Sequence, residues 1–271
     1  MIFKKIIRRI TRSTHQSKRL WREGNPFKSI VFFGSSLAKL KYPLEVSING
    51  QRTTIRPGTE DFGVVMECLS GEFEKAIQAA SPLRYGLIID AGGYIGTGAV
   101  AFARAFPDAR VVTIEPSRDN FKILCRNVSA YPNITVINKA LGRSEGSISL
   151  VSRGTGEWGF SIVQTPTDCA SPRMLHDVEI TTIPAILKEF QKDGIDLLKL
   201  DIEGGEYDLL SGQPAWLQST RVIFAELHER IVPGCEELFK LVTANRRALD
   251  KSREKVLSVL VAPETISRSA S

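Results

Sequence analysis

The stretch LIIDAGGYIGTGAVAFA, residues 87–103, constrains the fold of this chain more than any other part of its sequence. An apolar run ends in an acid, Asp90, and a glycine cluster then leads into a second apolar run of helical character. Glycine has no Cβ, so a turn built from glycines lets the backbone approach a ligand closely. In open parallel sheets, ligands bind outside the carboxyl ends of the strands. The stretch therefore predicts a strand, a ligand-binding turn and a helix, although glycine-rich turns also occur with no ligand at all.

After this turn the chain alternates between strand and helix patterns. The strand patterns span residues 86–90, 110–115, 133–138, 195–201 and 221–227. The helix patterns span residues 97–106, 117–129, 182–193, 204–212 and 235–250. Such alternation predicts an α/β fold with a doubly wound, mostly parallel sheet of the Rossmann-like class, covered by helices on both faces. Segment 146–181 interrupts the alternation, and we expect it to form a hairpin and a loop over the open end of the sheet.

The part of the chain before residue 86 predicts an extension of this sheet domain. Asn49 and Gly50 lie between two alternating runs, which is the signature of a β-hairpin with a type I′ turn. The run EDFGVVMECLSGEFEKAIQAA then predicts one or two helices with a break near Ser70 and Gly71. We divide the 271 residues into three parts: a basic N-terminal arm at 1–42, a hairpin and helical lead-in at 43–85, and the Rossmann-like domain with its 146–181 insertion at 86–271.

The arm carries the positive charge of the chain. Residues 1–42 hold 11 Lys or Arg and a single acid, whereas the remainder is mildly acidic. Apolar residues fall at helical spacing in its first twelve positions, namely Ile2, Phe3, Ile6, Ile7 and Ile10, and basic residues take the other face. This basic amphipathic helix, residues 1–12, predicts peripheral contact with an anionic membrane surface. The alternatives are a helix that packs its isoleucines on the body and a tail without fixed structure. We expect no nucleic-acid partner, because the charge is confined to the arm and no recognition motif accompanies it.

Composition and cysteine spacing give the expected location. No apolar run reaches the roughly 18–20 residues that a bilayer-spanning helix needs. The basic N-terminus lacks the apolar core and cleavage site of a secretory signal. The four cysteines form no C-x-x-C pair, which argues against zinc and disulfide frameworks. We therefore expect a cytoplasmic protein, which would be peripheral at the inner membrane surface if the basic arm binds the membrane.

Two acids close consecutive strands near the glycine cluster. Gly92 and Gly96 form the turn after Asp90, and Glu115 ends the next strand, where a carboxylate can accept hydrogen bonds from both hydroxyls of a ribose. A nicotinamide dinucleotide prefers G-x-G-x-x-G, which places its pyrophosphate on the helix N-terminus. Here the spacing is G-G-x-x-G-x-G after an acid. S-adenosylmethionine suits this pattern better, since it carries a positive sulfonium and amino group and no phosphate.

The second half of the domain adds a cluster of ionisable groups. The run IDLLKLDIEGGEYDLL places Asp201 at the end of a predicted strand, with Glu203 and Glu206 just beyond it. The run VIFAELHER places Glu226 and His228 at the end of the following strand. Because the carboxyl ends of parallel strands share one edge of a sheet, we expect these side chains to face the same pocket as the first two acids.

These stretches, taken together, resemble the FkbM-type S-adenosylmethionine-dependent methyltransferases. The matching runs lie in the family's order across residues 86–228: IIDAGGYIGTGAVAFA, VVTIEPSRDNFKILCRNV, NITVINKALG, IDLLKLDIEGGEYDLLSG and VIFAELHE. KLDIEGGE is the most specific, since general methyltransferases do not share it. The upstream run RPGTEDFGVVMECLSGEFE is similar to the segment that precedes the domain in many members. The chain departs from the family at Tyr94, where asparagine is usual, and around Ile183-Pro184, where an acid is common.

The resemblance implies O-methylation of a hydroxyl on a sugar, a glycolipid or glycan, or a secondary metabolite. The implied cofactor is S-adenosyl-L-methionine, and the implied partner is a small-molecule or glycan acceptor. We expect the cofactor to contact Asp90, Gly92, Gly96, Glu115, Asn120, Asn138 and Ala140. A hydroxyl acceptor must lose its proton, so the site needs a general base or a metal. We expect His228 to be that base, with Asp201 and Glu203 as further catalytic candidates; a structural role is the alternative for each.

Other functions stay open at this point. An NAD(P)-dependent oxidoreductase uses the same fold, and so does a domain that binds S-adenosylmethionine without turnover. We expect no metal ion, because clustered acids at a strand end also act as hydrogen-bond acceptors; a magnesium site at Asp201, Glu203 and Glu226 is the alternative. In the insertion, Trp158 and Phe160 are candidates to stack on a sugar, to close a lid or to fill the core.

Overall fold

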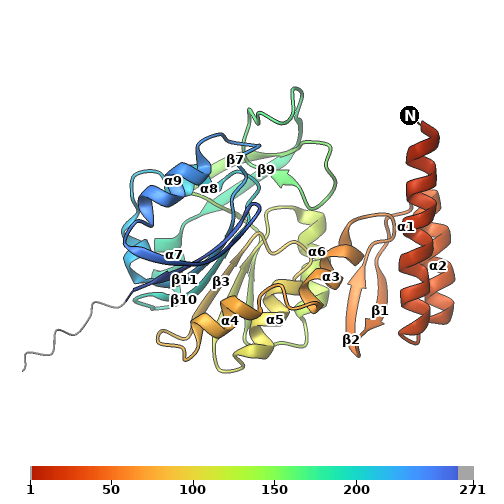
Figure 1. Cartoon of the computed structure of the whole chain (residues 1–271), viewed down its shortest axis with the longest axis horizontal. Helices are drawn as coiled ribbons and strands as arrows, with labels where there is room; N and C mark the ends of the chain where they lie inside the picture. Colours follow the sequence, from red (N-terminus) through yellow and green to blue (C-terminus); the bar gives the residue numbers. More distant parts are fainter. Residues whose placement is uncertain (1, 262–271) are drawn as a thin grey trace, which may run out of the picture.

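The centre of the molecule is a seven-stranded sheet with the order β12-β13-β11-β10-β3-β4-β5 (Figure 1). The computed structural model describes residues 2–261, with side chains from residue 7 onward. All neighbours from β5 to β11 pair in parallel, and β13 is antiparallel to both of its neighbours. The strands are β3 (Leu87–Ala91), β4 (Arg110–Ile114), β5 (Ile134–Ile137), β10 (Ile195–Leu200), β11 (Thr220–Glu226), β12 (Arg246–Ser252) and β13 (Lys255–Leu260). The predicted doubly wound, mostly parallel sheet is thus confirmed.

Helices cover both faces of this sheet, as the alternation predicted. The helices are α5 (Thr97–Ala105), α6 (Arg118–Val128), α7 (Ile183–Glu189), α8 (Glu206–Leu210) and α9 (Cys235–Val242), with a 3-10 turn at Ala215–Ser219. Local sequence sets where two of them begin: the hydroxyls of Ser117 and Thr182 accept backbone N–H groups from the first turns of α6 and α7. Each helix therefore begins at a position that places its apolar side on the sheet.

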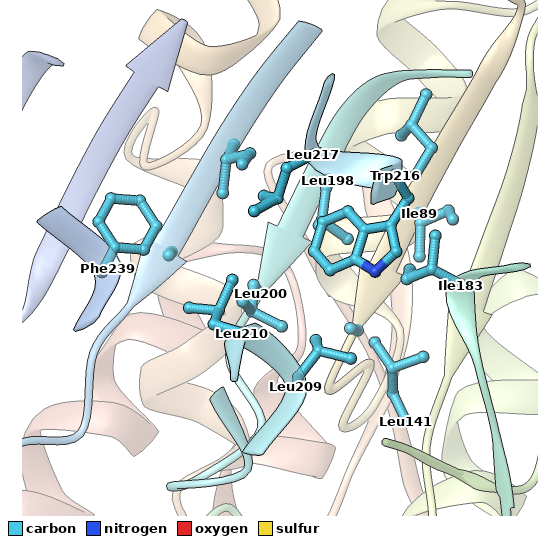
Figure 2. Packing of buried hydrophobic residues seen from close by; sticks show 14 of the residues in the cluster. Ile89, Leu141, Ile183, Leu198, Leu200, Leu209, Leu210, Trp216, Leu217 and Phe239 are labelled. Atoms are coloured by element: carbon cyan, nitrogen blue, oxygen red, sulfur yellow. The ribbon is translucent and has the colours of Figure 1, made fainter. Parts of the chain in front are cut away.

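The residues of each strand alternate between two apolar cores. Figure 2 shows one core, where Ile89, Leu198 and Leu200 of the strands meet side chains from the helices and from the 3-10 turn, including Trp216 and Phe239. The opposite faces of the same strands pack against α5, α6 and a further helix, α4 (Glu74–Ala80). Because successive strand residues point to opposite faces, a strand with a core on each side must be apolar throughout. This explains why these strands are continuous apolar runs in the sequence.

The predicted helix at 235–250 is wrong in its second half. Helix α9 ends at Val242, and the chain then forms β12 and β13, which extend the sheet beyond β11. The guanidinium of Arg246 is buried and donates to the backbone carbonyls of Leu217, Thr220 and Arg221. A helix there would leave the β11 edge unpaired, so backbone pairing across the sheet outweighs the local helical pattern.

The extension consists of two helices, a hairpin and two further helices. Its elements are α1 (Ile2–Arg22), α2 (Pro26–Ala38), β1 (Leu44–Ile48), β2 (Gln51–Ile55), α3 (Asp61–Leu69) and α4 (Glu74–Ala80). Asn49 and Gly50 have φ angles of 50° and 75°, which confirms the type I′ turn. Helices α1 and α2 lie beside this hairpin, at the end of the molecule away from β10 and β11 (Figure 1). Leu20 and Phe32 anchor them in a third apolar core with Val46 and Ile95.

The N-terminal helix is longer than the predicted one. It continues to Arg22, and Ile7 and Ile10 are 47% and 43% exposed, so neither is part of an apolar core. Met1 and the side chains at positions 2–6 lie outside the described residues. Within 2–261, every helix is too short or too polar to cross a lipid bilayer.

The insertion forms a small sheet of its own. Its strands β6 (Ala140–Leu141), β7 (Gly146–Ser152), β8 (Phe160–Ser161) and β9 (Arg173–Thr181) have the order β6-β9-β7-β8. Strands β7 and β9 pair antiparallel and correspond to the hairpin expected in 146–181. The loops around β8 reach the carboxyl ends of the central strands.

Candidate functional site

A cavity of about 360 Å³ opens at the carboxyl ends of β3, β4 and β10. Its lining comes mainly from the ends of these three strands, the turns that follow them and the insertion, with further residues from the lead-in and from β11. This is the place where an open parallel sheet binds ligands, and the volume suits a nucleoside-sized molecule. Of the ten residues expected in the site, seven line the cavity: Asp90, Gly92, Glu115, Asn120, Ala140, Asp201 and Glu203. Gly96, Asn138 and His228 lie outside its lining.

Strand register places three polar side chains in a row below the cavity, and two of them, Asp90 and Lys199, line it. Asp90 of β3 is the Cα partner of Thr113 in β4 and of Lys199 in β10. The Thr113 hydroxyl donates to Oδ2 of Asp90 at 2.9 Å, and Nζ of Lys199 lies 3.6 Å from Oδ1. Oδ1 of Asp90 is buried and has no hydrogen-bond partner among the described residues. Buried acceptors in folded proteins usually have a hydrogen-bond partner, so this oxygen is a candidate to accept from a ligand.

The glycine turn approaches the neighbouring strand end too closely for any side chain. A Cβ on Gly92 would lie 1.8 Å from the carbonyl oxygen of Asp201, and its φ is +83°. Lys199 ties the two turns together, since its Nζ donates to the Gly92 carbonyl at 2.8 Å and lies 3.1 Å from Oδ2 of Asp201. Gly96 has φ +86° and precedes α5, so it shapes the turn without facing the cavity.

Glu115 faces the cavity from the end of β4. One carboxylate oxygen accepts the backbone N–H of Tyr94 and the other that of Ser117, both at 2.9 Å. Burial raises the pKa of Glu115 to about 7, although these bonds and one from Asn120 favour the anion. Asn120 is held in turn by Arg56, whose guanidinium forms a buried ion pair with Asp61. The lead-in therefore supports the cavity wall.

Two expected cofactor residues differ in their placement. Ala140 lines the cavity from the short strand β6. Asn138 instead donates its amide to the carbonyl of Glu115 at 2.7 Å and fixes the end of β4 from behind. Tyr94 has φ 49° and donates its hydroxyl to Asp61, so it packs the lead-in against the glycine turn.

The turn after β10 is rich in carboxylates with defined partners. Glu206 is fully buried and accepts the backbone N–H groups of Ile202 and Gly204, each at 2.8 Å, which closes the turn. Glu203 adopts a left-handed φ of 53°, rare for a residue with a side chain. Its backbone carbonyl accepts the Ser161 hydroxyl at 2.5 Å. Burial raises the pKa of Glu203 to about 8, since the nearby cations offset desolvation only in part.

His228 lies behind these carboxylates rather than in the cavity wall. Its side chain is fully buried, and Nδ1 bonds Glu206 at 3.0 Å. Nε2 lies 3.7 Å from Oδ1 of Asp201 and 3.6 Å from Oε1 of Glu203, and it has no hydrogen-bond partner among the described residues. Burial alone would lower the pKa of His228, but the bond and charge of Glu206 and the two other carboxylates raise it to about 9.

The insertion closes the cavity over this second turn. Arg153 of the insertion forms buried ion pairs with Glu203 and Asp168. The carbonyl of Glu157 accepts the Asn120 amide at 2.8 Å, and Trp158 beside it lines the cavity. The insertion thus connects the acidic turn to the opposite wall.

Four residues with defined roles lie outside the ten that were given a cofactor or catalytic role; Glu206 was expected to face the pocket, but it lies outside the cavity lining. Thr113 and Lys199 lie on the same strand face as Asp90, so the register of adjacent strands would have identified them. Glu206 is the last acid of KLDIEGGE, and its partner His228 lies 22 residues away. No local pattern marks Arg153, because its contact with Glu203 depends on the path of the insertion.

Comparison with known proteins gives the family. A model of the FkbM methyltransferase domain matches residues 90–248, more than half of the chain. The methyltransferase sdnD of Sordaria araneosa is 26% identical over 153 residues, which cover 46% of this chain and 59% of that protein. The chain therefore spans less than two thirds of the length of this relative.

Solved methyltransferase structures resemble the chain only loosely. The Pyrococcus abyssi tRNA (uracil-54, C5)-methyltransferase in complex with S-adenosyl-L-homocysteine has a TM-score of 0.40 and 11% identity, covering 82% of this chain and 45% of that one. TYW2 of P. horikoshii in complex with MeSAdo has a TM-score of 0.40 and 13% identity, with coverages of 81% and 70%. The SAM-dependent methyltransferase of Agrobacterium tumefaciens has a TM-score of 0.40, 13% identity and coverages of 81% and 69%. Similarity at this level supports no conclusion about the function of this chain.

The family match covers the glycine turn, the acidic turn and the insertion between them. The sheet has the Rossmann-like arrangement of a class I methyltransferase, with six parallel strands and one antiparallel strand inserted near an edge. The chain belongs to the FkbM methyltransferase family.

Proposed function

We propose that this protein transfers a methyl group from S-adenosyl-L-methionine to a hydroxyl acceptor. The observation that carries the proposal is the unpartnered Oδ1 of Asp90 beside a glycine cradle, in the same cavity as the Glu115 carboxylate. These groups fit a cofactor that presents a positive amino group, a positive sulfonium and two ribose hydroxyls. The chain spans only 59% of its curated relative, so activity and acceptor both belong to this proposal.

The donor side of the cavity fits the cofactor in chemistry and shape. Asp90 would accept from the methionine amino group, and Glu115 would accept from the ribose hydroxyls, as an acid at this strand end does in related folds. Gly92 and Gly98 leave the floor without side chains, and Ala140 offers a small apolar wall for the adenine. When bound, the cofactor supplies a methyl group on a good leaving group.

The acceptor side is formed by Asp201, Glu203, Glu226 and Trp158. Carboxylates and an aromatic ring are suited to a polyol, because the carboxylates accept hydrogen bonds from its hydroxyls and the ring covers an apolar face of the sugar. We propose as acceptor a hydroxyl of a sugar, a glycolipid or glycan, or a secondary metabolite. Holding that hydroxyl in line with the methyl group is the chief task of this wall, and such positioning lowers barriers by up to about 7–11 kcal/mol.

We propose that Asp201 accepts the proton of the acceptor hydroxyl. It is the most exposed acid in the turn after β10, with 31% of its side chain exposed. His228 was the first candidate for the base. It is fully buried and outside the cavity lining, so we propose that it acts through the two carboxylates in front of it. It is therefore a positioning residue in this mechanism.

Ligand binding separates the proposal from the oxidoreductase alternative. S-adenosylhomocysteine at about a hundredfold excess over its Kd should raise the Tm by roughly 5–10 °C, whereas NAD should not raise it. Asp90→Ala should abolish the shift, and Asp119→Ala, at a site whose side chain is 81% exposed, should preserve it. Equal stabilisation by NAD would overturn the proposal. Stabilisation by S-adenosylhomocysteine without methyl transfer to any acceptor in a metabolite or glycolipid extract would support a binding domain instead.

We also propose that the N-terminal helices hold the protein against an anionic membrane surface. The support is the excess of basic residues in 1–42 together with exposed apolar side chains on α1 and α2, including Trp21, Phe27 and Ile30. Deleting residues 1–12, or changing Phe27 and Ile30 to serine, should weaken sedimentation with anionic vesicles. Leu241→Ser, which removes an equally exposed apolar residue from α9, should not. Unchanged partitioning of both arm variants would end this proposal.

A further inference from the structure

Three potential metal ligands converge beside the acceptor wall of the cavity. One atom each of Asp201, Glu203 and His228 lies within 4.8 Å of the other two. They come from the turn after β10 and from the end of β11, which are neighbouring strands. Clustered acids at a strand end are common without a metal ion, so the position of His228 is the deciding observation.

The imidazole of His228 is oriented from behind. Glu206 bonds Nδ1 at 3.0 Å and is itself fixed by the backbone N–H groups of Ile202 and Gly204. Nε2 is buried, unpartnered among the described residues, and faces the two carboxylates. A carboxylate bonded to one ring nitrogen of a histidine is the usual second sphere of a metal-bound imidazole, and a bound cation would take the place of the proton on the other nitrogen.

The two carboxylates are oriented in the same way. Lys199 lies 3.1 Å from Oδ2 of Asp201, and Arg153 pairs with Oε2 of Glu203. This leaves Oδ1 of Asp201 and Oε1 of Glu203 on the side of His228. Glu203 holds its position in a left-handed backbone conformation, and such conformations are concentrated at functional sites.

The spacing fits a cation better than direct hydrogen bonds. Nε2 lies 3.7 and 3.6 Å from the two carboxylate oxygens, beyond hydrogen-bond range. Ligands about 2.1 Å from one cation lie about 3.0–3.5 Å apart, so a small inward shift would suffice. A second group, Glu226, His228 and Glu254, also meets the distance criterion, but Glu254 does not line the cavity and pairs with Arg230 at 3.3 Å.

We propose that Asp201, Glu203 and His228 bind one divalent cation of the Mn²⁺ type, with its open positions toward the cavity. Two carboxylates and one imidazole combine the oxygen ligands of Mn²⁺ with the nitrogen ligand of first-row metals. In the role that rests on the proposed function, the cation holds the acceptor hydroxyl next to the methyl donor. The sequence favoured no metal, with a magnesium site at Asp201, Glu203 and Glu226 as the alternative; the structure places His228 with the first two acids instead.

The test is direct binding of Mn²⁺ to the full chain after chelation, without cofactor or acceptor. Loss of the free Mn²⁺ signal in electron paramagnetic resonance should reveal one site. Asp201→Asn, Glu203→Gln and His228→Gln should each weaken binding by at least about tenfold, and Glu206→Gln by about 10–100-fold, as for other residues that orient a ligand. Glu254→Gln should leave the affinity unchanged and serves as the matched control, because it belongs only to the second group.

Three results would overturn the inference. The first is the absence of saturable Mn²⁺ binding up to about 1 mM, a concentration on the order of the Kd of the weakest specific sites. The second is a loss of Mn²⁺ affinity in Glu254→Gln as large as that in the ligand variants. The third is full Mn²⁺ affinity in both Asp201→Asn and Glu203→Gln. Glu206 and His228 are buried, so their variants need an unchanged thermal melt to count, and the partly exposed Asp201 carries the test if they fail to fold. Mg²⁺, Ca²⁺ and Zn²⁺ competition then ranks the metals at the same site.

Failure of this inference is separable from failure of the proposed function. Stabilisation by S-adenosylhomocysteine with no Mn²⁺ binding would retain the methyltransferase and remove the metal. Saturable Mn²⁺ binding without such stabilisation would retain the metal site and remove the proposed function. If both hold, methyl transfer should fall at least about tenfold on chelation and recover on addition of Mn²⁺.

Discussion

Strands β3 and β10 are neighbours in the central sheet (Figure 1). The turns that follow them are nevertheless built in opposite ways. The first, DAGGYIG, has one acid, and glycines provide its shape. The second, DIEGGE, has three acids, and cations, a histidine and backbone N–H groups fix each of them. The first turn is thus shaped by glycines, which leave room beside the backbone, and the second presents charged side chains in fixed orientations.

Under the proposed function, this difference corresponds to two tasks, of which the first turn binds the methyl donor and the second positions the acceptor. A ligand that must lie flat against backbone needs space, whereas a proton or a cation needs fixed charge. Lys199 joins the two turns, with Nζ bonded to the Gly92 carbonyl and close to Asp90 and Asp201. Variants of the two turns should therefore affect different properties of the protein.

Gly92→Ala should be the most damaging change. The new Cβ would lie 1.8 Å from the Asp201 carbonyl oxygen in a left-handed backbone conformation, so both turns would have to move. We expect a loss of about 4 kcal/mol or more in the free energy of unfolding, measured by urea denaturation. Gly205→Ala is the control in the second turn, since its φ is −67° and its nearest neighbour is the flexible Ile202 side chain. Equal losses in both variants would show that the turns do not differ in this respect.

Arg153→Met tests whether the contact between the insertion and Glu203 affects only the second turn. It leaves Glu203 buried without its main cation, which should lower the free energy of unfolding by about 3 kcal/mol. Methyl transfer should fall, while the Kd for S-adenosylhomocysteine should stay within about threefold. Arg230→Met, at a more exposed arginine 3.9 Å from Glu203, should change stability by less than about 1 kcal/mol. A parallel loss of cofactor affinity in Arg153→Met would contradict the separation of the two tasks.

Asp90→Asn and Asp201→Asn should separate binding from turnover. Asp90→Asn removes a charged acceptor on the donor side, so S-adenosylhomocysteine should bind about 10–100-fold more weakly. Asp201→Asn should leave that affinity nearly unchanged and lower kcat by about a hundredfold. Calorimetric titration gives the first quantity and a methyl-transfer assay the second. The same pattern in both variants would remove the distinction between the two turns.

The pH dependence of cofactor binding should report Glu115. Its folded pKa of about 7 lies above its ordinary value of 4.5 because burial disfavours the charged form. The protonated form cannot accept from two ribose hydroxyls, so affinity should fall by up to about tenfold for each pH unit below 7. The same shift makes its contribution to stability decline as pH rises from 4.5 through 7. Glu115→Gln should flatten the binding profile, and an unchanged profile in that variant would assign the titration to another group.

Patterns in the sequence were enough to predict the sheet, the glycine turn, the acids at the strand ends and the hairpin at Asn49 and Gly50. These features follow from local rules: residue alternation, glycine conformation and turn chemistry act over a few residues. The helix predicted over 235–250 shows the limit of such rules, because β12 is a strand only through its pairing with β13.

The way in which the ionisable groups combine depends on contacts between distant parts of the chain. His228 lies 22 residues from Glu206, and Arg153 lies 50 residues from Glu203, yet these contacts determine which carboxylate oxygens remain free. The same contacts place His228 behind the cavity wall, although its residue type alone suggested a base at the surface. The charge state and direction of a buried side chain depend on atoms within a few ångströms, and the fold brings those atoms from distant parts of the chain.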